Sequence, residues 1–404
     1  MVKATGSADK SLQENWSRQT QMVRAGSERS NFGEMSEAIY FTSGFAYNTA
    51  EEAEARFSGE DDGFTYSRQS NPNLAMFESR IALLEGTEVA RATGTGMAAM
   101  AAALLCQLQA GDHVVAARAL FGSCRWLLET LLPRYGIHTT LVDGRNTDAF
   151  AAAVTPKTKL FWLESPANPT LDMVDIAAVA DIAHKHGARL VVDNVFATPV
   201  FQRPTELGAD IVCYSATKHI DGQGRALGGV VACSAAFDEE FLFPYYRHTG
   251  PAMSPFNAWV LLKGLETLSL RVNAMADGAE AVFTHLKNKG FKSRYPFDPD
   301  FEGYALAKAQ MARGGSMLTL ELAGKDQAFA FLNALELVDI SNNLGDSRSI
   351  ATHPWTTTHK ALAEESRLDL GITPGLLRLS IGLEDPQDLI LDITRALEIA
   401  KAKP

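Results

Sequence analysis

The chain has 404 residues, of which 46% are hydrophobic and 21% are charged. This composition is typical of a globular protein, and the length gives ample capacity for a core spread over two or three domains. The formal net charge of −11 disfavours nucleic acid or an anionic membrane as a partner, so any anionic substrate must be held by local cations.

Neither the beginning of the sequence nor its cysteines indicate secretion. Residues 1–29 are polar and mixed in charge, without the apolar core of a signal peptide. No apolar run reaches the roughly 18 residues that a membrane span requires. The cysteines form no C-x-x-C pair and lie in or beside apolar segments, at positions 106, 124, 213 and 233. We therefore expect a cytoplasmic protein that binds no membrane.

Residues 1–63 are predicted to form an N-terminal arm. A polar stretch at 11–29 is followed by an aromatic piece at 40–45, and a short charged helix at 50–57 ends in the turn 59–63. Because such a segment has little core of its own, we expect it to lie against something else, such as a neighbouring subunit.

The next loop, residues 64–73, contains Tyr66 and Arg68 in a Tyr-x-Arg pattern. Arg68 can donate two hydrogen bonds to a phosphate, and Tyr66 can donate a third. For an isolated pattern of this kind, a solvated loop is the commoner explanation.

A glycine-containing stretch, residues 92–99 (ATGTGMAA), leads into an apolar helix predicted for 97–108, after a helix at 74–85. Glycines before a helix N-terminus leave backbone N–H groups available to a phosphate. The stretch also partly matches a dinucleotide fingerprint, but the next strand, 113–116, runs into Ala117 and Arg118 without the expected acid. A single phosphate is therefore favoured, and a nicotinamide dehydrogenase remains the alternative.

Strands and helices then alternate. Strands are expected at 113–116, 136–142, 159–164 and 190–193, and helices at 123–132, 148–154 and from 175 to 186. This alternation predicts an α/β fold with a mostly parallel sheet flanked by helices. We assign residues 64–256 to a cofactor-binding domain, and we expect a loop at 237–255.

The apolar run that ends at Asp193 is expected to be a strand buried on both faces, with its carboxyl end at the ligand-binding edge of the sheet. Burying a carboxylate there is costly without a cationic partner. The pyridinium nitrogen of pyridoxal phosphate (PLP) would supply one. The alternative is an N-cap or turn aspartate before Asn194.

A second apolar run, 209–214, is followed by Ser215, Thr217 and Lys218, and then by a glycine-rich loop. A poorly solvated lysine has a lowered pKa, and its neutral amine can form a Schiff base with an aldehyde. The two hydroxyls can bind a phosphate. This stretch therefore predicts an anchor for PLP, against the alternative of a surface lysine after a buried strand.

The remainder, residues 257–404, is predicted to be a smaller α+β domain. A long helix runs from 257 toward 279, strands are expected at 315–322 and 376–382, and helices at 327–337 and from 385 onward. Arg378 interrupts an apolar strand. It either grips the α-carboxylate of an amino acid through two hydrogen bonds or is an arginine on an edge strand.

Five motifs occur in one order along the chain. They are residues 94–97 (GTGM), 164–169 (ESPANP), 192–199 (VDNVFATP), 215–219 (SATKH) and 377–382 (LRLSIG). Together they resemble the Cys/Met-metabolism family of PLP enzymes, which has the type I, aspartate-aminotransferase-like fold. The resemblance runs from about residue 40 to the C-terminus, and the lysine and aspartate motifs in one chain are highly specific.

The resemblance implies a role for each matching residue. Lys218 would carry the cofactor and Asp193 would pair with its ring nitrogen. Phosphate would be held by Gly96, Met97, Ser215 and Thr217, and by Tyr66 and Arg68 of a neighbouring subunit. Phe121 would stack on the ring with Asn168 beside it, and Arg378 would hold the substrate carboxylate. The implied assembly is a homotetramer of dimers that share active sites, and no metal is required.

Two departures from the family pattern narrow the reaction. Phe121 stands where most members have a tyrosine, so proton transfer is expected to fall more heavily on Lys218, with Tyr66 as a second candidate. Arg348 stands where members that handle cystathionine usually have a glutamate, and it would attract an anion rather than an ammonium. Asn343 and Leu344, in the same segment, are expected to line the substrate site.

The sulfhydrylases of the family, which use free sulfide, resemble this sequence more closely than its other members. The resemblance therefore implies a γ-replacement in which sulfide displaces succinate from an acylated homoserine and yields homocysteine. The acetyl ester, a γ-lyase of methionine or cystathionine and a cystathionine γ-synthase stay as alternatives. Arg348, Arg225 and Arg125 are the candidate ligands of the succinyl carboxylate. A non-catalytic binding protein would have no use for the lysine–aspartate pair.

Overall fold

The computed structural model describes residues 10–401, so the first nine residues of the predicted arm lie outside the described part. The chain divides into two compact units. The first comprises the residues up to Gln107, Cys213–Asp221 and Arg225–Thr267, and the second comprises Leu108–Val212, Gly222–Gly224 and the chain from Leu268 onward. The domain limits predicted at 63/64 and 256/257 stay a prediction.

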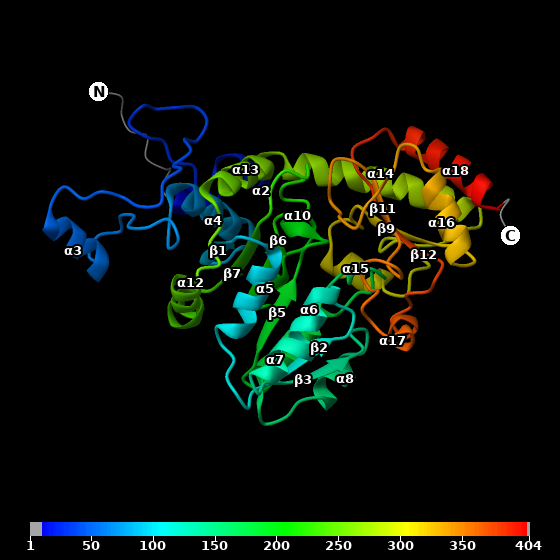
Figure 1. The fold of residues 1–404 in the computed structure, drawn as a ribbon, viewed down its shortest axis with the longest axis horizontal. Coiled ribbons are helices and arrows are strands. Elements are labelled where there is room, and N and C mark those ends of the chain that lie inside the picture. The colour runs from blue at the N-terminus through cyan, green and yellow to red at the C-terminus, as the bar shows by residue number, and fades with distance from the viewer. Residues whose placement is uncertain (1–9, 402–404) are drawn as a thin grey trace. The chain divides into compact units, whose positions relative to one another are not determined.

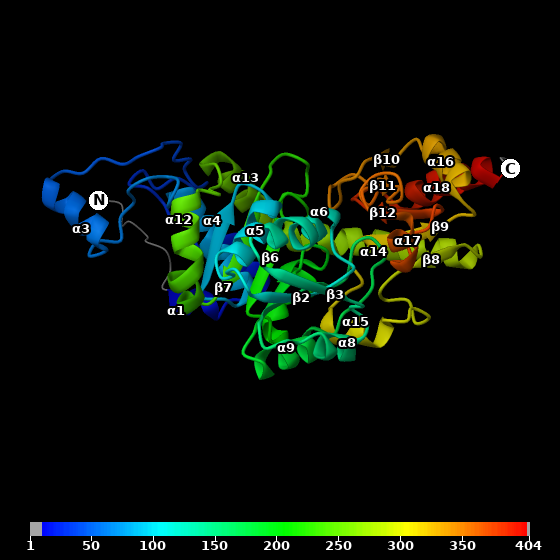
Figure 2. The same ribbon diagram turned by 60° about the horizontal axis from the view of Figure 1, so that its bottom comes forward.

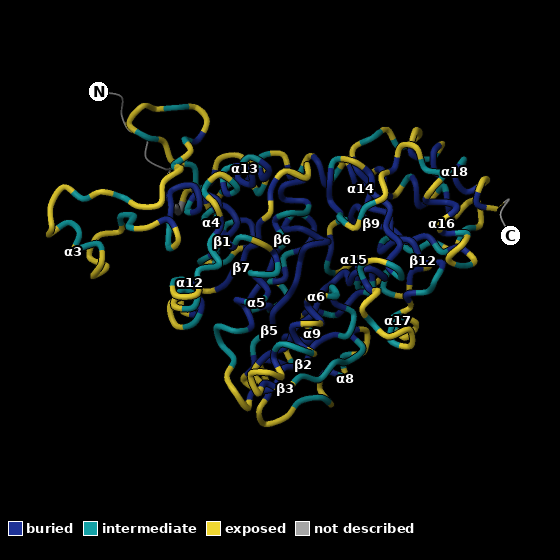
Figure 3. Tube along the Cα trace, viewed as in Figure 1, coloured by how far each residue is buried: buried dark blue, intermediate teal, exposed yellow. Residues whose placement is uncertain are grey.

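A seven-stranded sheet confirms the predicted α/β class (Figure 1). Its order is β1-β7-β6-β5-β4-β2-β3. Strand β2 pairs in parallel with β3 and β4, and β4 with β5, whereas β1 and β7 are antiparallel. The strands are β1 (Val89–Thr93), β2 (His113–Ala117), β3 (His138–Val142), β4 (Thr158–Glu164), β5 (Arg189–Asp193), β6 (Ile211–Ser215) and β7 (Gly229–Cys233). Every residue of β2 and β7 is buried, as continuous apolar strands require (Figure 3).

In the first unit, the helices around the strands begin and end where local signals predict. Helix α4 (Pro72–Glu85) is capped by the Asn71 side chain, has proline at its first position and ends at Gly86 with φ of 74°. Helices α1 (Lys10–Glu14), α2 (Arg18–Arg24) and α3 (Ala50–Ser58) belong to the predicted arm, and α3 is largely exposed in Figure 3.

Two expectations about the segment after β7 are wrong. Residues 237–255 are mostly helical, as α11 (Ala235–Phe237), a π-helical turn (Asp238–Leu242) and α12 (Phe243–Thr249). The single helix expected from 257 is two helices, α13 (Pro255–Glu266) and α14 (Leu268–Asn288). The prolines suggested a loop, but Pro255 occupies the first turn of α13, where a missing N–H costs nothing, and Pro244 directly follows the π-helical turn within a continuous helical run.

In the second unit, β2–β5 alternate with helices as predicted. The helices are α6 (Gly122–Trp126), a π-helical turn (Leu127–Leu131), α7 (Leu132–Arg134), α8 (Thr147–Ala152), α9 (Ile176–Lys185) and α10 (Thr198–Phe201), followed by a 3-10 turn (Pro204–Leu207). Asp175 caps α9 by accepting a hydrogen bond from Ala178 N–H, as expected of an aspartate before a helix.

The second unit also contains a five-stranded sheet of order β10-β11-β12-β9-β8, which confirms the expected α+β region. Its strands are β8 (Lys292–Arg294), β9 (Met317–Glu321), β10 (Asp339–Ile340), β11 (Ile350–Thr352) and β12 (Leu376–Ser380). Helices α14, α16 (Lys325–Ala334) and α18 (Pro386–Lys401) share one apolar core with this sheet (Figure 2). Helices α15 (Tyr304–Gln310) and α17 (Glu364–Asp369) complete the unit. Within residues 10–401, no helix is both long and apolar enough to cross a membrane.

Candidate active site

In the first unit, the N-terminus of α5 (Gly96–Leu105) lies against the end of β6. A Cβ atom placed on Gly96 would come 2.6 Å from Ser215 Cβ, so only glycine lets the two segments approach this closely. Thr95 caps the helix by accepting a hydrogen bond from Ala98 N–H at 3.0 Å. The first turn of a ten-residue helix, including Met97, therefore begins beside a serine hydroxyl, an arrangement suited to an anion.

The predicted lysine follows this serine directly. Strand β6 ends at Ser215, and a turn spans residues 216–221. Lys218 is half-buried in this turn, and its backbone N–H donates to Ser215 O at 3.3 Å. The Thr217 hydroxyl accepts from Gly228 N–H at 3.0 Å, which ties the turn to the glycine-rich loop. The structure therefore brings together Gly96, Ser215, Thr217 and Lys218 as one group of this unit.

Tyr66 and Arg68 lie on the surface of the same unit. Tyr66 is 44% exposed, and the Arg68 guanidinium lies over its ring with 5.4 Å between Cζ and the ring centroid. Arg68 also donates a hydrogen bond to the Arg247 carbonyl. Among the described residues, no hydrogen bond or ion pair joins these two side chains to the Gly96 group, so their contact with phosphate stays a prediction.

In the second unit, two carboxylates end neighbouring strands. Glu164 of β4 and Asp193 of β5 are register partners in the parallel ladder. Asp193 is 5% exposed and accepts from Val195 N–H at 3.1 Å. Burial raises the pKa of Asp193 well above its ordinary value, because the charged form loses its hydration. A cation placed beside Asp193 would restore the carboxylate.

The sequence-based site did not include Glu164. This side chain is 2% exposed and accepts two backbone hydrogen bonds, from Phe121 N–H at 3.0 Å and from Asn168 N–H at 3.2 Å. Burial and the neighbouring Asp193 raise its pKa, and Arg378 opposes that rise. The signal that pointed to Asp193, a carboxylate at the end of an apolar strand, also applies to Glu164.

Arg378 lies in β12 and is 1% exposed. Its Nη1 donates to Asn168 Oδ1 at 2.8 Å, and its Nη2 donates to the carbonyl of Asn343 at 2.9 Å and to the Thr352 hydroxyl at 3.2 Å. The buried Nε has no hydrogen-bond partner. Burial lowers the pKa of Arg378 to about 10, against the opposing charge of Glu164. Since β12 lies between β11 and β9, the edge-strand alternative is wrong.

The other predicted substrate residues differ in their surroundings. Asn343 contributes its carbonyl to Arg378, and Leu344 is buried in an apolar cluster with Phe196 and Met317. The Arg348 side chain, by contrast, is 66% exposed and forms an ion pair with Asp346 at 3.4 Å. The structure thus brings Asn168 and Asn343 to Arg378, and it leaves Arg348 on the surface of the unit.

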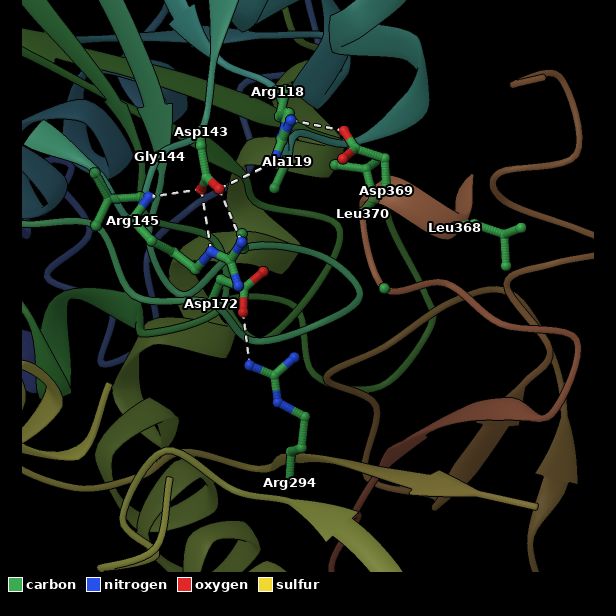
Figure 4. A pocket seen from close by; sticks show the side chains of 13 residues that line it. Arg118, Ala119, Asp143, Gly144, Arg145, Asp172, Arg294, Leu368, Asp369 and Leu370 are labelled. Atoms are coloured by element: carbon green, nitrogen blue, oxygen red, sulfur yellow. Dashed lines mark hydrogen bonds and ion pairs between the residues drawn. The ribbon is translucent and has the colours of Figure 1, made fainter. Parts of the chain in front are cut away.

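A cavity of about 160 Å³ in the second unit contains none of the predicted site residues (Figure 4). Its arginines are already paired: Arg118 with Asp143 and Asp369, Arg145 with Asp143, and Arg294 with Asp172, at 2.6–2.9 Å. Because these charges are balanced within the cavity, it offers no unpaired cation to an anionic substrate.

Comparison with known proteins identifies the family. The model of the Cys/Met metabolism PLP-dependent enzymes matches residues 19–398. The chain belongs to this family. It is 48% identical to an O-succinylhomoserine sulfhydrylase of Mycobacterium tuberculosis, with 96% of this chain and 97% of the relative covered. It is 40% identical to an L-methionine gamma-lyase of Porphyromonas gingivalis, with 94% and 96% covered.

A solved structure agrees with the family fold. A Campylobacter jejuni protein assigned as an O-acetylhomoserine (thiol)-lyase superposes with a TM-score of 0.91 at 29% identity, covering 95% of this chain and 100% of that one. That protein carries N'-pyridoxyl-lysine-5'-monophosphate. The type I fold predicted from the motifs and the predicted PLP cofactor are thereby confirmed.

The residues present fit PLP on three observations. Gly96 and Ser215 form a close contact at a helix N-terminus, where a phosphate is favoured. Among the described residues no cation counters the effect of burial on the pKa of Asp193, and a pyridinium N–H would supply one. The unpaired Nε of Arg378 is suited to a carboxylate of the substrate.

Proposed function

We propose that this enzyme replaces the succinyl group of O-succinyl-L-homoserine with sulfide and forms L-homocysteine and succinate. The claim that the substrate is an amino acid rests on buried Arg378. This cation has an unpaired Nε, and its other nitrogens donate to uncharged acceptors. The choice of ester and of sulfide rests on the 48% identity with the M. tuberculosis sulfhydrylase.

In this proposal, each of the two groups of residues binds a different part of the cofactor. Lys218 anchors PLP, and the phosphate is held by Gly96, Met97, Ser215 and Thr217. Asp193 holds the ring nitrogen protonated, while Phe121 covers the ring and Asn168 lies beside it. Tyr66 and Arg68 reach the phosphate of a neighbouring subunit, which is consistent with their exposure on the surface of their own unit. The proposal therefore includes a cytoplasmic homotetramer built from dimers that share active sites.

Bound PLP supplies an electron sink that acidifies the substrate at Cα. Arg378 binds and orients the α-carboxylate, with Asn343 and Leu344 lining the site, and Arg348 attracts the succinyl carboxylate. The Lys218 amine takes the proton from Cα and then moves a proton at Cβ, since Phe121 has no hydroxyl to share this work. The Cγ–O bond breaks as succinate leaves, and a Cγ–S bond forms with sulfide.

A product assay tests this function. Purified enzyme is incubated with O-succinylhomoserine or O-acetylhomoserine, each with and without sulfide. We expect homocysteine and succinate in the presence of sulfide, and a higher kcat/KM for the succinyl ester. Faster turnover of the acetyl ester would contradict the proposed substrate.

A methionine γ-lyase is the second candidate, because the P. gingivalis relative is 40% identical over nearly the whole chain. A lyase forms 2-oxobutanoate and ammonia without sulfide. Ready formation of both products from methionine alone would favour that function over the sulfhydrylase.

A further inference from the structure

Glu164 connects three parts of the second unit that bear on the substrate. One carboxylate oxygen accepts from Phe121 N–H, at the residue before α6, and the other accepts from Asn168 N–H. Asn168 in turn accepts a hydrogen bond from Arg378 through its side chain. A single buried carboxylate therefore holds the backbone at Phe121 and the turn that orients Arg378.

The charge balance around Arg378 also depends on Glu164. The hydrogen-bond acceptors of Arg378 are an amide oxygen, a hydroxyl and two backbone carbonyls, all uncharged. A guanidinium that is 1% exposed needs a nearby negative charge, because burial of an isolated ion is strongly unfavourable. Glu164 is linked to Arg378 through Asn168, whose backbone N–H it accepts and whose side chain accepts from Arg378, and its charge opposes the lowering of the Arg378 pKa.

We propose that Glu164 is a positioning residue that serves as the counter-ion of Arg378 before substrate binds and takes up a proton when a carboxylate binds to Arg378. The inference rests on the proposed role of Arg378 in that site. Once a carboxylate neutralises Arg378, a second negative charge on Glu164 would have no partner, and protonation removes it. The Phe121 and Asn168 N–H groups then retain one acceptor oxygen between them.

The groups around Glu164 restrict where that proton can go. Asp193 on β5 disfavours a second negative charge, and Arg378 on β12 favours one until its own charge is neutralised. His359, in the loop before α17, is nearly fully buried. Burial, with the charges of Arg378 and Arg125 of α6, lowers the pKa of His359 to about 4, so it stays neutral above that pH. In the proposed PLP-loaded site Asp193 is paired with the ring nitrogen of the cofactor, so Glu164 is the group that we expect to respond to a carboxylate at Arg378.

Calorimetry on the PLP-loaded enzyme tests the proposal without turnover. Propionate, a carboxylate without an amine, is titrated in mildly alkaline PIPES and Tris buffers, whose different ionisation heats report the protons exchanged. We expect an uptake approaching one proton per bound propionate in the parent. Because the proton must be acquired on binding, affinity should fall as pH rises through the titration of free Glu164. Binding without proton uptake would overturn the proposal.

Variants assign the proton to its site. Glu164→Gln should abolish most of the uptake and bind propionate about tenfold more tightly in alkaline buffer, since the repelling charge is gone. Glu164→Asp retains the carboxylate and should restore the uptake. Unchanged uptake in Glu164→Gln would overturn the inference. Glu78→Gln is the matched control, because Glu78 is a half-buried carboxyl of the first unit that also accepts a backbone hydrogen bond, from Ala92 N–H. The proton uptake of Glu78→Gln on propionate binding should equal that of the parent.

Arg378→Lys separates this inference from the proposed function. If propionate affinity does not depend on residue 378, the carboxylate site itself is wrong. If affinity falls in Arg378→Lys while Glu164→Gln leaves the uptake intact, the carboxylate site holds and only the role of Glu164 fails.

Discussion

The two groups of site residues are built on different physical principles. The Gly96 group of the first unit uses a helix N-terminus, a close glycine contact and hydroxyls that follow one strand. The group in the second unit buries two carboxylates and a guanidinium, supplied by β4, β5 and β12. The first group depends on the close approach of two backbone segments. The second depends on buried charges of opposite sign that compensate one another away from water. Substitutions should therefore impair the two groups in different ways.

The largest effect is expected at Lys218. Lys218→Ala removes the amine that anchors the cofactor and moves protons, so we expect a loss of activity of about 10³-fold or more. Sulfide-dependent homocysteine formation measures it. Borohydride reduction and peptide mapping provide the control, because the parent should carry a pyridoxyl label on Lys218 and the variant should not. A variant that turns over like the parent would contradict the role of Lys218.

Arg378→Lys tests the charged group of the second unit. A lysine keeps the charge but cannot donate from two parallel N–H groups, so we expect kcat/KM for the ester to fall by about 10–100-fold. Arg348→Lys is the matched control at an exposed, ion-paired arginine, and it should change kcat/KM much less. Equal losses in the two variants would remove the distinction between the arginines.

Gly96→Ala tests the close approach in the first unit. The added Cβ would meet Ser215 at 2.6 Å, and the displacement should weaken PLP binding by about 1–3 kcal/mol. Equilibrium dialysis of the apoenzyme with PLP measures this loss. Gly324→Ala is the control, since its Cβ would meet nothing within 4 Å, and its affinity for PLP should match the parent. An unchanged affinity in Gly96→Ala would argue against a phosphate at this contact.

The smallest effect is expected at Arg348. Arg348→Glu reverses an exposed charge and removes an electrostatic attraction to the succinyl carboxylate. We therefore expect kcat/KM for the succinyl ester to fall by a few-fold. The acetyl group is uncharged, so kcat/KM for the acetyl ester should fall less. Kinetics with the two esters measure the ratio of kcat/KM values. If both esters lose equally, Arg348 has no role in choosing the ester, and buried Arg125 becomes the next candidate to test.

Local patterns predicted the elements that local physics controls. The end of the helix at residue 85 before Gly86 and the buried strands before Asp193 and Lys218 are all short-range features, and the structure has them where expected. Pro255 misled because proline breaks a helix interior but is accommodated in the first turn. Which of these applies depends on where the helix starts.

The sequence by itself determined the class of the fold and the cofactor, because alternating apolar runs and the lysine motif are short-range features that need no distant partner. Only the tertiary structure decided that Glu164, Asn168 and Arg378 form one linked set, and that Arg378 is interior while Arg348 is exposed. The reason is desolvation: the behaviour of a charged side chain depends on what surrounds it in space, and those neighbours come from distant parts of the chain.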